Sequence, residues 1–189
     1  MRLFIAVDVP DAWRAAAAVQ QQALEEMLPA DTRRALRPVR GELMHLTVRF
    51  LGELEESAVM PLRAALDAIL PFSITLSLDH AGTFGPPART GVVWLGVDGE
   101  LRPLRALARD VERGLRLIGM RPEERPLAAH LTLARLSRNA TVEDRRAVAE
   151  AVQALESPPL APFAADRLLL VRSHLDGPAP RYEVLSRHP

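Results

Sequence analysis

The sequence predicts an α+β fold made of two pseudo-symmetric halves, with mainly antiparallel sheets and a groove between the halves. The main observation is a pair of similar stretches, HLTVRF at residues 45–50 and HLTLAR at residues 130–135. Each stretch is preceded by a predicted strand and a predicted helix, so the same order of elements occurs twice. Some neighbouring strands also follow each other with no helix between them, which favours antiparallel pairing over a parallel sheet. We expect residues 1–189 to form a single bilobal domain.

The first part of the chain alternates a buried strand, a helix and the first motif strand. Residues 2–8 are rich in Leu, Phe, Ile and Val and end before Pro10, as is typical of a strand. Asp11 is expected to cap a helix over residues 12–28, which is rich in strong helix formers. Residues 31–42 show little periodicity and are expected to be a connection. Residues 44–51 form the first motif strand.

Periodicity and turn residues predict the remaining elements. In order, they are a helix at 57–70, a strand at 72–78, a loop at 82–89 and a strand at 92–97. A long helix follows, opened by Asp98 and Gly99, with apolar positions from Leu101 to Ile118, and ended by Gly119. The last elements are a connection at 121–126, the second motif strand at 130–136, a helix capped by Thr141 with Asp144, and strands at 168–171 and 182–185 around Asp176, Gly177 and Pro178.

The composition is that of an ordinary globular protein, with 48% apolar and 25% charged residues. All 24 basic residues are Arg, which we attribute mainly to coding bias, and the net charge is zero. A neutral chain does not suit nonspecific coating of nucleic acid, so phosphate binding should be local. The lack of cysteine excludes disulfides, thiolate metal sites and a Cys nucleophile. No signal peptide or membrane span is apparent, so we expect a cytoplasmic enzyme with no membrane partner. We also expect a monomer.

The two motifs pair histidine with threonine on one face of a strand. Because side chains alternate along a strand, His45 and Thr47 share one face, as do His130 and Thr132. The intervening apolar residues then point into a core. Two such ribbons facing each other across a groove would converge on one small anionic group.

Paired histidines suit acid–base chemistry on phosphate because their ordinary pKa lies near neutrality. One neutral imidazole takes a proton from the nucleophile and one protonated imidazole donates a proton to the leaving oxygen. Threonine hydroxyls can donate to phosphate oxygens. The three other histidines, His80, His174 and His188, are expected to be structural or surface residues.

The two arginines that follow the motifs give a conflict. Arg49 lies four residues after His45, an even offset that places it on the histidine face of a regular strand. Arg135 lies five residues after His130, so alternation turns it to the far side unless the strand ends or bulges near Ala134. Alternation therefore favours Arg49 in the groove.

The chain resembles the 2H phosphoesterase superfamily, and within it the RNA 2′,3′-cyclic phosphodiesterases, also called 2′-5′ RNA ligases. The two His-x-Thr motifs carry most of the resemblance. Further similarity lies in RLFIAVDVP at 2–10, LG at 51–52, GTFG at 82–85, VVWLGV at 92–97, LVRS at 170–173 and YEVL at 182–185.

The resemblance implies hydrolysis of RNA or nucleotide 2′,3′-cyclic phosphate to a 2′-phosphomonoester, with no metal or other cofactor. It implies that His45 is the general acid and His130 the general base, although the reverse order stays open. Thr47 and Thr132 would hold the phosphate, with Arg135 assisting. The resemblance thus favours Arg135 over Arg49 as the arginine in the groove. Phe84 either stacks on a base or packs its loop onto the core. Reversible 2′-5′ RNA ligation and a non-catalytic module that binds RNA ends or nucleotides are the alternatives.

Overall fold

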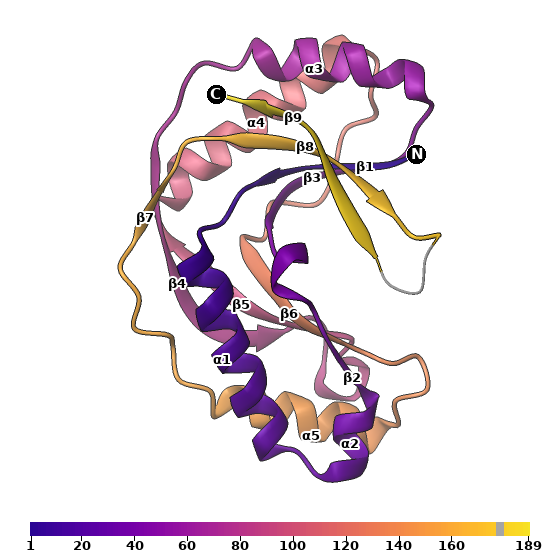
Figure 1. Ribbon diagram of the computed structural model, residues 1–189, viewed down its shortest axis with the longest axis vertical. Coiled ribbons are helices and arrows are strands. Elements are labelled where there is room, and N and C mark those ends of the chain that lie inside the picture. The colour runs from indigo at the N-terminus through magenta and orange to yellow at the C-terminus, as the bar shows by residue number, and fades with distance from the viewer. Residues whose placement is uncertain (177–179) are drawn as a thin grey trace.

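The structure is a computed structural model that describes residues 1–176 and 180–189 (Figure 1). The helices are α1 (Asp11–Met27), α2 (Ala30–Ala35), α3 (Val59–Asp67), α4 (Leu101–Leu117) and α5 (Val142–Gln153), with the short 3-10 helices η1 (Gly41–Leu43), η2 (Glu56–Ala58) and η3 (Pro87–Arg89). The strands are β1 (Arg2–Val7), β2 (Leu36–Pro38), β3 (Leu46–Glu53), β4 (Ile74–Thr83), β5 (Val92–Gly99), β6 (His130–Leu136), β7 (Phe163–Ala165), β8 (Leu168–His174) and β9 (Arg181–His188).

The strands of the described residues form one curled sheet of nine strands. Its order is β7-β4-β5-β6-β3-β1-β8-β9, and β2 pairs with β6 as well. Each of these pairings is antiparallel. The predicted α+β class with antiparallel pairing is therefore confirmed.

The two motif strands, β3 and β6, are direct neighbours at the centre of this sheet. Their ladder holds one residue pair, Leu46 with Leu131, whereas the ladders on either side are longer. Leu46 and Leu131 are both fully buried, so the two strands turn the same face to the core. The two motif strands therefore lie side by side at this one pair, and the expected groove between two halves stays a prediction. The bilobal domain with pseudo-symmetric halves stays a prediction.

The sheet has a helix-covered face and an open face. On the covered side, helix α4 buries Leu104, Leu107, Val111 and Leu115, whose spacings of three and four define one stripe. The open face carries a smaller apolar cluster of Phe4, Ala6, Leu169 and Val171, against which Tyr182 packs. We use the name open face for the side of the sheet that bears this cluster.

Two expectations for the first part of the chain were wrong. Pro10 occupies the N-cap of α1, and Asp11 is the first helical residue, where it pairs with Arg14 at 3.0 Å instead of capping. The connection expected at 31–42 contains α2, β2 and η1. Leu36 of β2 is buried and pairs with Leu136 of β6, so tertiary pairing outweighs the weak local pattern.

The loop expected at 82–89 begins later, because Gly82 and Thr83 belong to β4. The indole of Trp94 on β5 occupies the space that a Cβ at Gly82 would need. This glycine therefore serves a close approach within the sheet rather than a turn. The short strand β7 was not expected. Gly177 and Pro178 of the predicted final turn lie outside the described residues.

The predicted ends of the later helices are confirmed. Thr141 and Asp144 form a capping box at the start of α5: the Asp144 carboxylate accepts from the Thr141 amide at 2.9 Å. Gly119 follows α4 with φ of +81°, a left-handed conformation that favours glycine. In the described ranges, no helix combines the length and the apolar character needed to cross a bilayer.

Candidate active site

The structure brings the two motif histidines and threonines together on the open face. Leu46 pairs with Leu131, and the same antiparallel register sets His45 across from Thr132 and Thr47 across from His130. The charge of His130 acts on His45, which agrees with this proximity. The four side chains therefore form one compact group.

Both imidazoles are held by the same backbone contact. Nδ1 of His45 lies 2.8 Å from the carbonyl oxygen of Leu43, and Nδ1 of His130 lies 2.7 Å from that of Ala128. A carbonyl oxygen only accepts, so Nδ1 of each ring carries the proton and donates it. Nε2 of each neutral ring is then the nitrogen with a free lone pair, ready to accept a proton.

Burial keeps both rings neutral near pH 7. It lowers the pKa of His45 from 6.5 to about 4, against the opposing hydrogen bond to Leu43, and the charges of His130, Arg135 and Arg14 lower it further. Burial also lowers the pKa of His130, again against a backbone hydrogen bond, and the charge of Arg135 contributes. The Arg135 guanidinium is thus close enough to act on both histidines.

Aromatic side chains fix the orientation of each imidazole. His45 stacks on Phe4 with ring centroids 4.5 Å apart, and the Tyr182 ring meets it edge-on at 5.3 Å. His130 meets Phe84 edge-on at 4.8 Å, and Phe84 in turn lies 5.6 Å from Trp94. Each histidine therefore has a polar contact on one side of the ring and an aromatic contact on another.

A β-bulge in β3 turns Arg49 away from the open face. Ile5 pairs with Arg49 and Ala6 pairs with Thr47, so Val48 is an extra residue on this strand. Arg49 is consequently on the helix-covered side, with its side chain 11% exposed. Its Nε lies against Glu112 of α4, and its Nη1 is 3.3 Å from Glu123.

A matching bulge in β6 turns Arg135 onto the open face. Val93 pairs with Ala134 and Trp94 pairs with Thr132, so Leu133 is the extra residue. Leu133 and Ala134 are both fully buried, while Arg135 is exposed. The expectation from regular alternation is therefore wrong for both arginines, because each strand is bulged between its threonine and its arginine.

Three aromatic residues of the site were missed from the sequence: Phe4, Phe50 and Tyr182. Phe50 pairs with Phe4, is 53% exposed and lies five residues after His45, as Arg135 does after His130. This shared offset was the available signal for Phe50. Tyr182 is the sole tyrosine of the chain and comes from the distant strand β9, which no local pattern connects to His45.

Phe84 packs against the site and keeps an exposed side, and its expected stacking on a base stays a prediction. Its ring packs against His130 and Trp94, yet the residue is 40% exposed.

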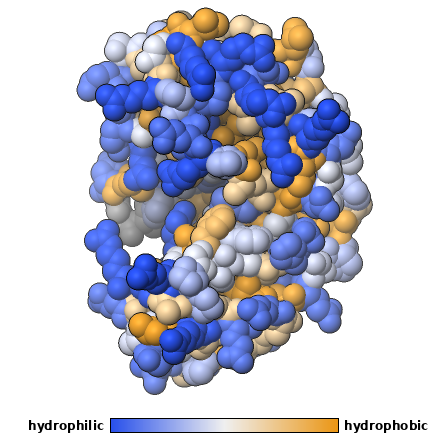
Figure 2. Space-filling model, turned by 180° about the vertical axis from the view of Figure 1, so that it is seen from behind, coloured by the Kyte–Doolittle hydropathy of each residue, from blue (hydrophilic) through white to orange (hydrophobic). Residues whose placement is uncertain are grey.

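On the face seen in Figure 2, the surface is hollowed between an upper and a lower part, and mostly hydrophilic side chains border the hollow.

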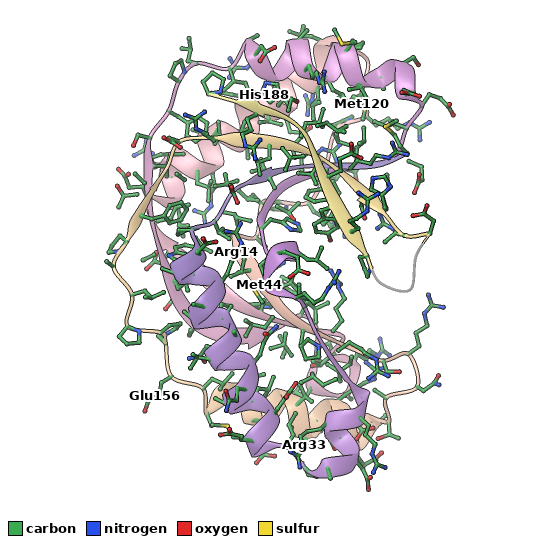
Figure 3. All side chains as sticks on the ribbon, viewed as in Figure 1. Arg14, Arg33, Met44, Met120, Glu156 and His188 are labelled. Carbon is green, nitrogen blue, oxygen red and sulfur yellow. The ribbon has the colours of Figure 1, made fainter. Side chains whose placement is uncertain are left out.

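The other histidines lie in separate contacts. His80 pairs with Asp79 at 2.7 Å, and His174 pairs with Glu183 at 2.8 Å. His188 is buried between Ser186 and Asp67 at the end of the molecule beside α3, well away from Met44, the neighbour of His45 (Figure 3). Across residues 1–176 and 180–189, His, Cys, Asp and Glu side chains form no group of three or more suited to a metal ion.

Known proteins resemble this chain in sequence. A family model described as the 2′-5′ RNA ligase superfamily matches residues 9–177. The RNA 2′,3′-cyclic phosphodiesterase of Aeropyrum pernix is 36% identical over 101 residues, which are 53% of this chain and 57% of that protein. The protein of the same name from Archaeoglobus fulgidus is 33% identical over 138 residues, 73% of this chain and 74% of that one. The one from Methanocaldococcus jannaschii is 25% identical over 98% of each chain.

Solved structures show the same fold. TT0787 of Thermus thermophilus superposes with a TM-score of 0.77 at 27% identity, covering 100% of this chain and 97% of that one. Escherichia coli LigT complexed with 3′-AMP has a TM-score of 0.72 at 28% identity, covering 98% and 95%. With the family match and the paired His-x-Thr motifs, these similarities establish that the chain belongs to the 2′-5′ RNA ligase superfamily.

Proposed function

We propose that the chain hydrolyses the terminal 2′,3′-cyclic phosphate of RNA or of nucleotides to a 2′-phosphomonoester, with no metal ion. The observation that carries this proposal is the pair of imidazoles on one face, each with Nδ1 bound to a carbonyl and Nε2 available. The names of the relatives from Archaeoglobus fulgidus and Methanocaldococcus jannaschii support the reaction. A cyclic phosphate of this kind requires a 2′ oxygen, which makes RNA the substrate class.

In the proposed reaction, one neutral imidazole removes a proton from water through Nε2, and the water oxygen bonds to phosphorus. The bond from phosphorus to the 3′ oxygen breaks, and the second, protonated imidazole donates its proton to that oxygen. The products are a 3′-hydroxyl and a 2′-phosphate, and proton exchange with solvent restores both rings. Thr47 and Thr132 donate hydrogen bonds to the non-bridging oxygens, and Arg135 stabilises the negative charge that develops on them.

The environments of the two histidines bear on their roles. The resemblance assigns His45 as acid and His130 as base. However, burial above all, and the charge of His130 as a lesser cause, hold the pKa of His45 down at about 4. This favours His130 as the ring that carries a single proton on the pair. In that state His130 is ready to donate and His45 is ready to accept. We therefore propose the reverse order, with His130 as acid and His45 as base.

The exposed aromatic rings beside the histidines suit a nucleobase. Phe84 contacts His130 and Phe50 lies near Phe4, the ring on which His45 stacks. Nucleobases of every kind stack on such rings, so this contact does not depend on the RNA sequence. The solved structures of Escherichia coli LigT complexed with 3′-AMP and with phosphate support a nucleotide as the ligand of this chain. We propose that residues 1–189 act as one bilobal unit, with this site between its halves.

The proposal is tested by incubating the protein with an oligoribonucleotide that ends in a 2′,3′-cyclic phosphate, in the presence of EDTA. We expect complete conversion to the 2′-phosphate. A second reaction contains an RNA with a 5′-hydroxyl: a joined product that exceeds the hydrolysed one would establish ligation as the main activity instead. Tight binding of the cyclic end with no turnover would show a binding module and refute the proposed hydrolysis.

A further inference from the structure

Helix α1 turns two polar residues toward the sheet, Gln20, which is buried, and Gln21, which is partly buried. Ala17, Leu24 and Leu28 are buried, and Gln21 lies between them at the same spacing of three and four residues. The neighbouring Gln22 is exposed and donates to Glu26 at 2.9 Å on the solvent side. A polar side chain on the core stripe needs hydrogen-bond partners, since burial without them is costly.

The Gln21 amide finds its partners on β6 and on the residue that follows β2. Its Nε2 donates to the carbonyl oxygen of Leu133 at 2.6 Å and to that of Val39 at 2.8 Å. The amide nitrogen has two hydrogens, and both partners only accept, so this contact determines which way the amide points. The Val39 amide also donates to the Leu133 carbonyl at 2.8 Å.

Leu133 is the extra residue of the β6 bulge. A bulge interrupts the ladder, so the carbonyl of its extra residue needs a partner outside the regular pairing with β5. Gln21 and Val39 supply these donors from the opposite side of β6. The bulge is also what carries Arg135 onto the open face, because a regular strand would turn a residue five positions after His130 to the far side.

We infer that Gln21 is a positioning residue for the reaction: by holding the Leu133 carbonyl and thus the β6 bulge, it directs the Arg135 guanidinium to the phosphate. This inference rests on the proposed function in so far as Arg135 binds the reacting phosphate. Gln21 itself lies on the helix-covered side of the sheet and acts through the strand.

The inference predicts that Gln21 and Arg135 are coupled. Gln21→Met keeps the length of the side chain but removes both donors, and Gln22→Met is its matched control on the solvent side. We expect Gln21→Met to lower kcat/KM by about 10- to 100-fold, the scale of a misplaced catalytic group. We expect Gln22→Met to leave kcat/KM within about twofold.

The same change in an Arg135→Ala background separates positioning from mere structural support. If Gln21 acts through Arg135, the double variant should be no slower than Arg135→Ala alone. A loss of kcat/KM in that background equal to the loss in the native background would overturn the inference, because Gln21 would then act independently of Arg135.

A second measurement needs no catalysis. The charge of Arg135 lowers the pKa of His130, so its displacement should raise that pKa, as followed by NMR titration of the imidazole. We expect the rise in Gln21→Met and in Arg135→Ala, with no further rise in the double variant. An unchanged pKa of His130 in Gln21→Met would refute the inference. This readout holds even if the native chain fails to hydrolyse a cyclic phosphate, so failure of the proposed function is recognised separately.

Discussion

The half-site around His45 and the half-site around His130 share a backbone frame but carry different side chains. In each, Nδ1 of the histidine donates to the carbonyl two residues earlier, and a bulge follows the threonine. The fifth residue after the histidine reaches the open face in both, as Phe50 in one and Arg135 in the other. One frame thus provides an apolar half-site and a charged one, which places the two histidines in unequal environments.

The two bulges also differ in how neighbouring helices hold them. In β6, Gln21 of α1 donates to the backbone of the bulge at Leu133. In β3, Arg49 donates to its neighbour, the Phe50 carbonyl, at 2.6 Å and pairs with Glu112 of α4. A neutral amide therefore supports one half-site, and a largely buried ion pair supports the other.

Removal of either imidazole should have the largest effect. We expect His45→Ala and His130→Ala each to lower kcat/KM by about 10²- to 10⁴-fold, the contribution of a general acid or base. His80→Ala is the control, because that ring is exposed, pairs with Asp79 and meets Trp94 rather than either motif histidine. Near-native rates in either of the first two variants would remove that histidine from catalysis.

A substrate with sulfur in place of the 3′ oxygen sharpens the same comparison. A thiolate leaves without protonation, so the variant that lacks the acid should recover much of its rate on this substrate, while the variant that lacks the base should not. We expect recovery in His130→Ala. Recovery in His45→Ala instead would show that the acid is His45.

Replacing the two motif arginines should affect different properties, activity for Arg135 and stability for Arg49. We expect Arg135→Ala to lower kcat/KM by about 10²-fold, as for loss of one donor to a developing anion, with little change in stability. We expect Arg49→Ala to lower the free energy of unfolding by about 3 kcal/mol, because it leaves Glu112 without its partner. Urea unfolding and steady-state kinetics of both variants measure this, and the opposite pattern would contradict the assigned positions.

Stability should fall in mild acid because of His45. Its pKa is near 6.5 in the unfolded chain and about 4 in the folded one, so between these values only the unfolded state gains the proton. The free energy of unfolding should therefore decrease as pH falls from 6.5 to 4, by about 2–3 kcal/mol from this residue. His45→Gln should flatten that part of the curve. An equal decrease in this variant would assign the loss to other groups.

The smallest expected effect concerns the two exposed phenylalanines. A stacked base contributes about 1–3 kcal/mol, so Phe50→Ala and Phe84→Ala should each raise KM for a nucleoside 2′,3′-cyclic phosphate by about 5- to 150-fold. Ribose 2′,3′-cyclic phosphate has no base and serves as the control substrate. An equal rise in KM for this control would show that the rings position the histidines rather than the base.

The fold class and the paired histidines could be predicted because they depend on local patterns. Alternation placed the His and Thr side chains on one face, and the burial of Leu46 and Leu131 agrees with it. The choice between Arg49 and Arg135 depended on two bulges, which are features of strand pairing and leave no mark on hydrophobic periodicity. Tyr182 reaches the site because β9 pairs with β8 and β8 pairs with β1, which is a contact between the two ends of the chain.

The central claim is that His45 and His130 form an acid–base pair that opens a 2′,3′-cyclic phosphate without a metal ion. Phosphorus NMR of adenosine 2′,3′-cyclic phosphate, incubated in EDTA with the native chain and with each histidine-to-alanine variant, tests this claim most directly. The account predicts conversion to adenosine 2′-phosphate by the native chain and loss of nearly all turnover in both variants. Turnover that stops in EDTA, or that persists in either variant, would contradict it.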